Sequence, residues 1–138
     1  MKNVLVVLAL VLTLPAIQTI AQTGEKGKKT PQPLEVLPIT DIPGTASAIT
    51  SFLKPKLAIS DAQSPKVIGQ ISEFLKTKSA FIEQAKSNPT EYIARFNSAQ
   101  ARFQSELRAV LTPAQYSKFL DLKPKSSDSG NLLSHLFF

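Results

Sequence analysis

The chain has 138 residues, of which 10 are proline, none is cysteine and one is histidine, and its formal net charge is +6. This length fits one domain and excludes a multidomain enzyme. Without cysteine the chain cannot form disulfides or be acylated on cysteine, and the one histidine, His135, cannot make a structural zinc site, which needs about four Cys or His ligands.

Residues 1–21 have the three-part layout of a secretory signal peptide. A basic start at Lys2 precedes a nearly unbroken apolar run over residues 4–14, and a small-x-small exit ends at Ala21. The run stops at Pro15, short of the roughly 18 residues that a membrane-spanning helix needs. We therefore expect a cleaved signal and a periplasmic protein, with secretion as the alternative.

Residues 22–44 are rich in proline and lysine. Prolines at this density are predicted to prevent a helix. The apolar residues in the second half of the segment are nevertheless too many for a pure spacer; they are Leu34, Val36, Leu37, Ile39 and Ile42. The segment is thus expected to be either a flexible linker or an extended arm that lies on the folded body.

Residues 45–123 have a helical period, and no segment alternates as a strand would. A short helix with apolar residues from Ala46 to Leu53 is expected to stop before Pro55, because the residue before a proline avoids the helical conformation. Two long helices of about 22 residues each follow. Their apolar faces consist of Val67, Ile68, Ile71, Phe74, Leu75, Phe81 and Ile82 in the first helix and of Tyr92, Ile93, Phe96, Phe103, Leu107 and Leu111 in the second.

The short junction at residues 86–88 predicts that the two long helices turn back on each other as an antiparallel hairpin. Ion pairs at i,i+4 are expected on the second helix, Glu91 with Arg95 and Arg102 with Glu106. A C-terminal helix follows. The fold class is therefore all-α, with a short helix, a long hairpin and a C-terminal helix.

Residues 124–138 are predicted to form a flexible, serine-rich tail. Its last seven residues, 132–138, are mostly apolar. This end of the tail is expected either to dock on the folded domain or to bind a partner.

Two capping boxes lie in matching sequence context, the second 52 residues after the first. Each has an apolar residue, a hydroxyl cap and a glutamine three positions after the cap. Their residues are Ile59, Ser60 and Gln63 in the first box and Leu111, Thr112 and Gln115 in the second. Pro65 leaves a competing start for the first long helix, with Ser64 as the N-cap and Pro65 at the first helical position.

This pair of boxes resembles the two LTxxQ motifs of the Spy/CpxP-like periplasmic proteins, over roughly residues 46–123. The resemblance implies a thin, curved, antiparallel helical dimer that binds unfolded or partly folded proteins without ATP. Some relatives restrain sensor kinases, so a sensor kinase domain is a second implied partner. Other relatives bind metals through histidines, a role that the lone His135 does not support.

Four residues of the helical hairpin are candidates for client binding. Arg95 and Arg102 are seven residues apart and so share a helix face, where positive charge could steer acidic clients; the alternative is an ordinary solvated face. Phe74 and Phe81 are the apolar candidates, although such residues lie more often in the core.

The chain has no P-loop, no G-x-S-x-G elbow and no H-E-x-x-H motif, and its carboxylates are scattered singly. We therefore expect no enzyme activity, catalytic residues, cofactor or metal. Export and the lack of interleaved aromatic and basic residues argue against nucleic-acid binding. The alternative function is a structural or envelope-associated helical protein that acts through its apolar tail, the only part expected to contact a membrane.

Overall fold

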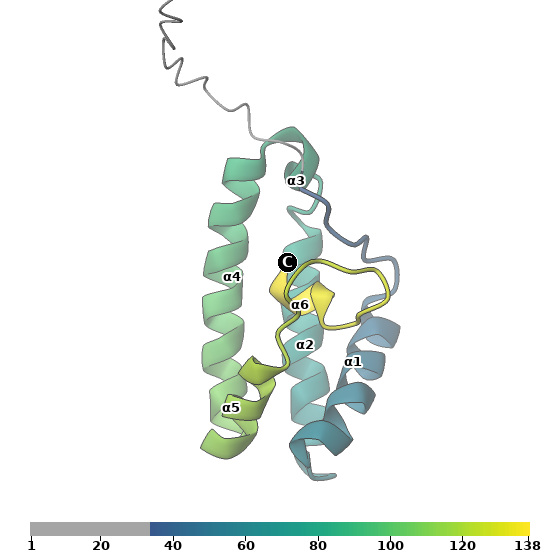
Figure 1. Ribbon diagram of the computed structural model, residues 1–138, viewed down its shortest axis with the longest axis vertical. Coiled ribbons are helices and arrows are strands. Elements are labelled where there is room, and N and C mark those ends of the chain that lie inside the picture. Colours follow the sequence, from purple (N-terminus) through teal and green to yellow (C-terminus); the bar gives the residue numbers. More distant parts are fainter. Residues whose placement is uncertain (1–33) are drawn as a thin grey trace, which may run out of the picture.

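A computed structural model describes residues 34–138 and shows an all-α protein in this range, as predicted (Figure 1). The expected signal peptide lies outside the described residues. The helices are α1 (Ile42–Leu57), α2 (Ser64–Ser79), α3 (Gln84–Ser87), α4 (Pro89–Val110), α5 (Pro113–Asp121) and α6 (Ser134–Phe137).

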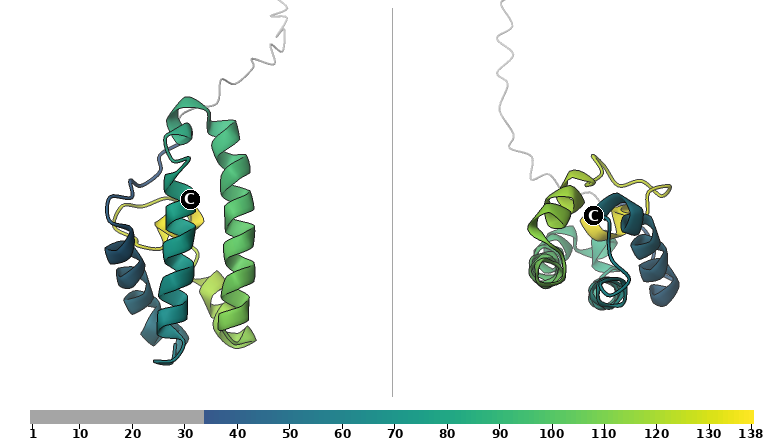
Figure 2. Two further views of the ribbon diagram at one scale, coloured as in Figure 1. Left: turned by 180° about the vertical axis from the view of Figure 1, so that it is seen from behind. Right: turned by 90° about the horizontal axis from the view of Figure 1, so that it is seen from below.

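The helices form two layers. α2 and α4 lie side by side as an antiparallel pair joined through α3, which confirms the predicted hairpin (Figure 1). α1, α5 and α6 all lie on one side of this pair, as the view along the helices shows (Figure 2). The core fills the space between the two layers, and the hairpin is covered on one face only.

α1 is longer than the sequence pattern suggests. It begins at Ile42, because Asp41 caps the Gly44 amide and Pro43 stands in the first turn, where a missing N–H costs nothing. It also continues through Pro55 to Leu57, so the expected stop before Pro55 was wrong. Proline here removes one hydrogen bond in the last turns, whereas continuing the helix buries Leu57 fully on the core stripe.

α2 is shorter than expected. It has 16 residues, whereas α4 has the anticipated 22. After Ser79 the chain tightens into i to i−3 hydrogen bonds, with the Phe81 amide on the Lys78 oxygen at 3.1 Å and the Ala85 amide on the Ile82 oxygen at 3.0 Å. This tighter turn lets both Phe81 and Ala85 face the core.

Residues 34–41 form an extended arm along the folded body. The Leu34 amide donates to the Ala85 oxygen at 2.9 Å. Leu34, Val36 and Ile39 are partly buried against the core. Pro38 therefore disfavours a helix in this stretch, and the apolar residues on both sides of it hold the arm in place.

The C-terminal segment is part of the core. Leu133, Leu136 and Phe137 are 2%, 0% and 6% exposed, and the Phe137 ring stacks on Phe119 with centroids 5.2 Å apart. Of the two expectations for this end of the tail, docking on the folded domain or binding a partner, the structure shows docking. Burying three large apolar side chains stabilises the docked position by roughly 1.5–3 kcal/mol for each side chain, which outweighs the cost of ordering the short connection.

Candidate functional site

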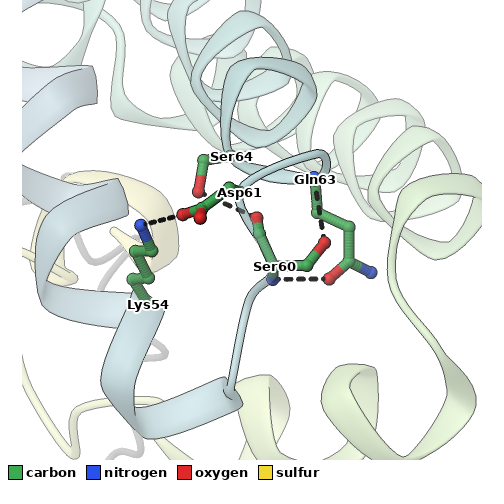
Figure 3. Close-up of polar contacts among 5 residues, drawn as sticks. All are labelled: Lys54, Ser60, Asp61, Gln63 and Ser64. Carbon is green, nitrogen blue, oxygen red and sulfur yellow. Dashed lines mark hydrogen bonds and ion pairs between the residues drawn. The ribbon is translucent and has the colours of Figure 1, made fainter.

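The first capping box closes a turn between α1 and α2. The Ser60 amide donates to Gln63 Oε1 at 3.0 Å, and the Gln63 amide donates to Ser60 Oγ at 3.2 Å (Figure 3). Both bonds of the predicted box are present. An exposed ion pair adds a second link between α1 and the turn, because Lys54 Nζ lies 2.6 Å from Asp61 Oδ1. The hydrogen bond from Lys54 and its positive charge lower the pKa of the Asp61 carboxyl.

α2 begins at Ser64, with Pro65 in its first turn, so Gln63 lies in the turn before the helix. Ser64 does not act as an accepting cap, because its hydroxyl donates to the Ser60 main-chain oxygen at 3.1 Å. The structure thus combines the two expected starts: the helix begins at the later residue, and the Ser60 box still forms.

The second capping box has the predicted geometry at the start of α5. The Thr112 amide donates to Gln115 Oε1 at 2.9 Å, and the Gln115 amide donates to Thr112 Oγ1 at 3.2 Å. The apolar residue before each cap, Ile59 or Leu111, is buried in the core at 4% or 6% exposure. Each motif therefore combines a core anchor with a closed turn.

The two glutamines meet each other, which the motifs alone did not predict. Gln63 Nε2 donates to Gln115 Oε1 at 2.9 Å and to the Val110 main-chain oxygen at 3.0 Å. In return, Gln115 Nε2 lies 3.1 Å from Gln63 Oε1 and donates to the Ala58 main-chain oxygen at 3.0 Å. We call this set of four residues the glutamine clasp.

The clasp has an internal two-fold pattern. Gln63 and Gln115 are 52 residues apart, and so are the two residues whose main-chain oxygens they bind, Ala58 and Val110. Each glutamine donates to the other glutamine and to the main-chain oxygen near the other capping box. Both N–H donors of each amide are used, which is the full donor capacity of a glutamine side chain. The clasp joins the α1–α2 turn to the α4–α5 turn through hydrogen bonds between their residues, an arrangement that can fix the two turns relative to each other.

The candidate client-binding residues lie along one groove between α2 and α4. Its first part is lined by Phe81, Arg95, Ala99 and Arg102 and has a volume of about 450 Å³. The second part continues over Phe74 and shares Ala99 and Arg102 with the first. The structure therefore brings all four predicted residues to one surface.

The four residues take different positions in this groove. Arg95 and Arg102 are exposed and form the predicted ion pairs, with Glu91 at 2.7 Å and Glu106 at 2.9 Å, and Glu106 raises the pKa of Arg102. Phe74 and Phe81 are only 4% and 6% exposed. They are therefore mainly core residues, and only a small part of each lines the groove.

Sequence reasoning missed a buried polar site at α6. Lys78 is 0% exposed, and its ammonium donates to the main-chain oxygens of His135, at 2.9 Å, and Phe138. The ring of Phe96 lies 5.4 Å from the same nitrogen, and burial lowers the pKa of Lys78 to about 7. Lys78 follows Ile71 and Leu75 on the apolar face of α2. A lysine at a position of this apolar face was the sequence feature that could have predicted a buried polar contact.

Among residues 34–138 no group of acidic, histidine or cysteine side chains is placed to hold a metal ion. No helix in this range is long and apolar enough to cross a bilayer.

The chain matches no known protein-family model, and no curated protein or solved structure was found to match it. The resemblance to Spy/CpxP-like proteins therefore rests on the two motifs and their spacing, and it stays a prediction.

Proposed function

We propose that this protein is an ATP-independent periplasmic chaperone or envelope-stress adaptor that binds unfolded or partly folded polypeptides. The observation that carries the proposal is the groove between α2 and α4. Because α1, α5 and α6 cover the other side of the hairpin (Figure 2), this side stays open to a partner.

The groove offers two kinds of contact that an unfolded chain can use. Its lining includes the small exposed parts of Phe74, Phe81 and Phe103, which can contact apolar side chains. Its rim carries Arg95 and Arg102, whose ion pairs engage Nε, while a guanidinium has five N–H donors in all. Main-chain oxygens and acidic side chains of a client are suitable acceptors for the others.

The shape of the groove provides the sharpest test. In Ala99→Phe a ring would fill the groove where its two parts join, without a change of charge. In the matched control, Ala101→Phe, the ring stands on an exposed position of the same helix outside the groove. We expect the first variant to lose most of its ability to slow aggregation of an unfolding client, and the second to keep it, with no nucleotide present.

Charge is tested separately. Arg95→Gln with Arg102→Gln should slow client capture more than Lys118→Gln with Lys125→Gln, which removes the same charge away from the groove. Raising the salt from about 0.05 to 0.5 M should also slow capture, because the screening length falls to a few ångströms. If the wild-type protein at several-fold excess protects neither of two different clients, the chaperone proposal is wrong.

Two further parts of the proposal concern partners. We infer self-association into a homodimer from the resemblance, and sedimentation at several concentrations measures it. A sensor kinase domain is the proposed partner in the adaptor role, and titration with a purified sensor domain tests it. The alternative of action through the apolar tail has less support, because Leu133, Leu136 and Phe137 are buried.

A further inference from the structure

The C-terminal segment, residues 131–138, lies on the inner face of the helical hairpin like a bound peptide. Three of its apolar side chains, Leu133, Leu136 and Phe137, are buried in the core. Its four-residue helix α6 packs against α2 (Figure 1). The surface on which it lies includes residues of α2 and α4.

The hairpin holds this segment by its main chain. Lys78 of α2 donates to the main-chain oxygens of His135 and Phe138, and Gln100 Nε2 of α4 donates to the Leu136 oxygen at 2.9 Å. The His135 and Leu136 oxygens are main-chain carbonyls, which every peptide carries. In peptide-binding sites such main-chain hydrogen bonds contribute affinity, while the pockets for side chains, here those that bury Leu133, Leu136 and Phe137, provide specificity.

The buried ammonium group of Lys78 needs hydrogen-bond acceptors that a peptide in this site supplies. An ammonium group that is fully buried is costly unless hydrogen bonds compensate it, and among the described residues its hydrogen-bond acceptors both belong to the segment. The Phe96 ring adds one cation–π contact. A segment that served only to fill the core would not need a lysine beneath it, because a methionine would pack equally well.

The connection to α5 holds the segment only loosely. The hydrogen bonds described for residues 124–131 are local: the Asp128 amide donates to Ser134 Oγ at 3.0 Å, and the Gly130 and Asn131 amides donate to Asp128. Such a short tether supplies the segment at an effective concentration of roughly millimolar. A peptide from another molecule must compete with this concentration.

We propose that the Lys78–Gln100 surface is a peptide-binding site that the C-terminal segment occupies in cis. Its ligand is a short apolar peptide that forms one helical turn with Leu-x-x-Leu-Phe spacing, as residues 133–137 do. This site lies on the opposite side of the hairpin from the groove of Arg95 and Arg102. It is therefore independent of the proposed chaperone function, and its test needs no client.

The experiment uses the full chain with a site-specific protease sequence inserted between Ser126 and Ser127. A fluorescent synthetic peptide of residues 131–138 is added before and after cleavage, and fluorescence anisotropy measures its binding. We expect weak binding to the intact chain and at least tenfold tighter, saturable binding to the cleaved chain, because cleavage removes the tether. A peptide with serine at the positions of Leu136 and Phe137 should not compete.

Two variants of the cleaved protein test the main-chain contacts. Gln100→Leu should weaken peptide binding about fivefold and Lys78→Met about tenfold, since each removes donors to main-chain oxygens. The matched control is Gln70→Leu, on the groove side of α2, and it should bind the peptide as the wild type does. Circular dichroism establishes that each variant is folded before its affinity is compared.

Two results would overturn the proposal. In the first, the cleaved chain keeps its own fragment and does not exchange it for the labelled peptide over several days. In the second, the cleaved chain loses its helical signal and added peptide does not restore it. Either result would make the segment an inseparable part of the core.

Discussion

Replacing Gln115 by alanine tests whether the glutamine clasp stabilises the fold beyond its capping boxes. A capping residue alone contributes about 1 kcal/mol, which is the loss that we expect for Thr112→Ala. Gln115 also donates to the Ala58 oxygen and shares reciprocal bonds with Gln63. At about 1 kcal/mol net for each hydrogen bond, Gln115→Ala should lower the free energy of unfolding by about 2–3 kcal/mol.

The two glutamines should also be coupled. Gln63→Ala and Gln115→Ala each remove the same amide–amide contact, so the double variant loses it only once. We therefore expect the double variant to be less destabilised than the sum of the singles, by about 1 kcal/mol. Gln104→Ala, on α4 outside the clasp, should change the free energy of unfolding by less than about 0.5 kcal/mol.

Gln115→Glu separates the clasp from the cap. A carboxylate still accepts the Thr112 amide and suits a helix N-terminus, but it has no N–H to donate to the Ala58 oxygen or to Gln63. The cap alone would predict a neutral or stabilising change, whereas the clasp predicts a loss of about 1–2 kcal/mol.

Urea unfolding followed by circular dichroism measures all of these variants. The clasp would have no energetic role if Gln115→Glu were as stable as the wild type and the two alanine substitutions were additive within about 0.3 kcal/mol.

Three further predictions concern the clasp and the buried lysine. Ala58→Gly should stabilise the protein by up to about 1 kcal/mol in the same assay, because Ala58 has a φ of 52°, a conformation that glycine adopts without strain. Ser60→Ala should cost about 1 kcal/mol and Ser64→Ala less, because Ser60 accepts in the box whereas Ser64 only donates; equal losses would contradict this. Burial lowers the pKa of Lys78 to about 7, so above that pH the unfolded chain binds more protons at this residue than the folded chain does. The free energy of unfolding should therefore rise between pH 7 and 9. The rise should be smaller than about 1.4 kcal/mol per pH unit, which is the limit for a single titrating group. Lys78→Met should remove this rise, and an unchanged slope in that variant would refute the assignment.

Local patterns determined much of this fold. The helical period and the short junction predicted the hairpin of α2 and α4, and the i,i+4 charges predicted the ion pairs of Arg95 and Arg102. Both capping boxes formed at the predicted residues. The ion pairs and the capping boxes depend on contacts between residues at most four positions apart, which a sequence displays directly.

Contacts between distant residues decided the rest. α1 continues through Pro55 because burial of Leu57 outweighs one missing hydrogen bond, and propensity alone cannot weigh that burial. The clasp joins residues 52 positions apart, and Lys78 reaches main-chain oxygens 57 and 60 positions away. A capping box does not reveal that a second box will face it, and an apolar tail does not reveal what it packs on, because both depend on how the two layers assemble.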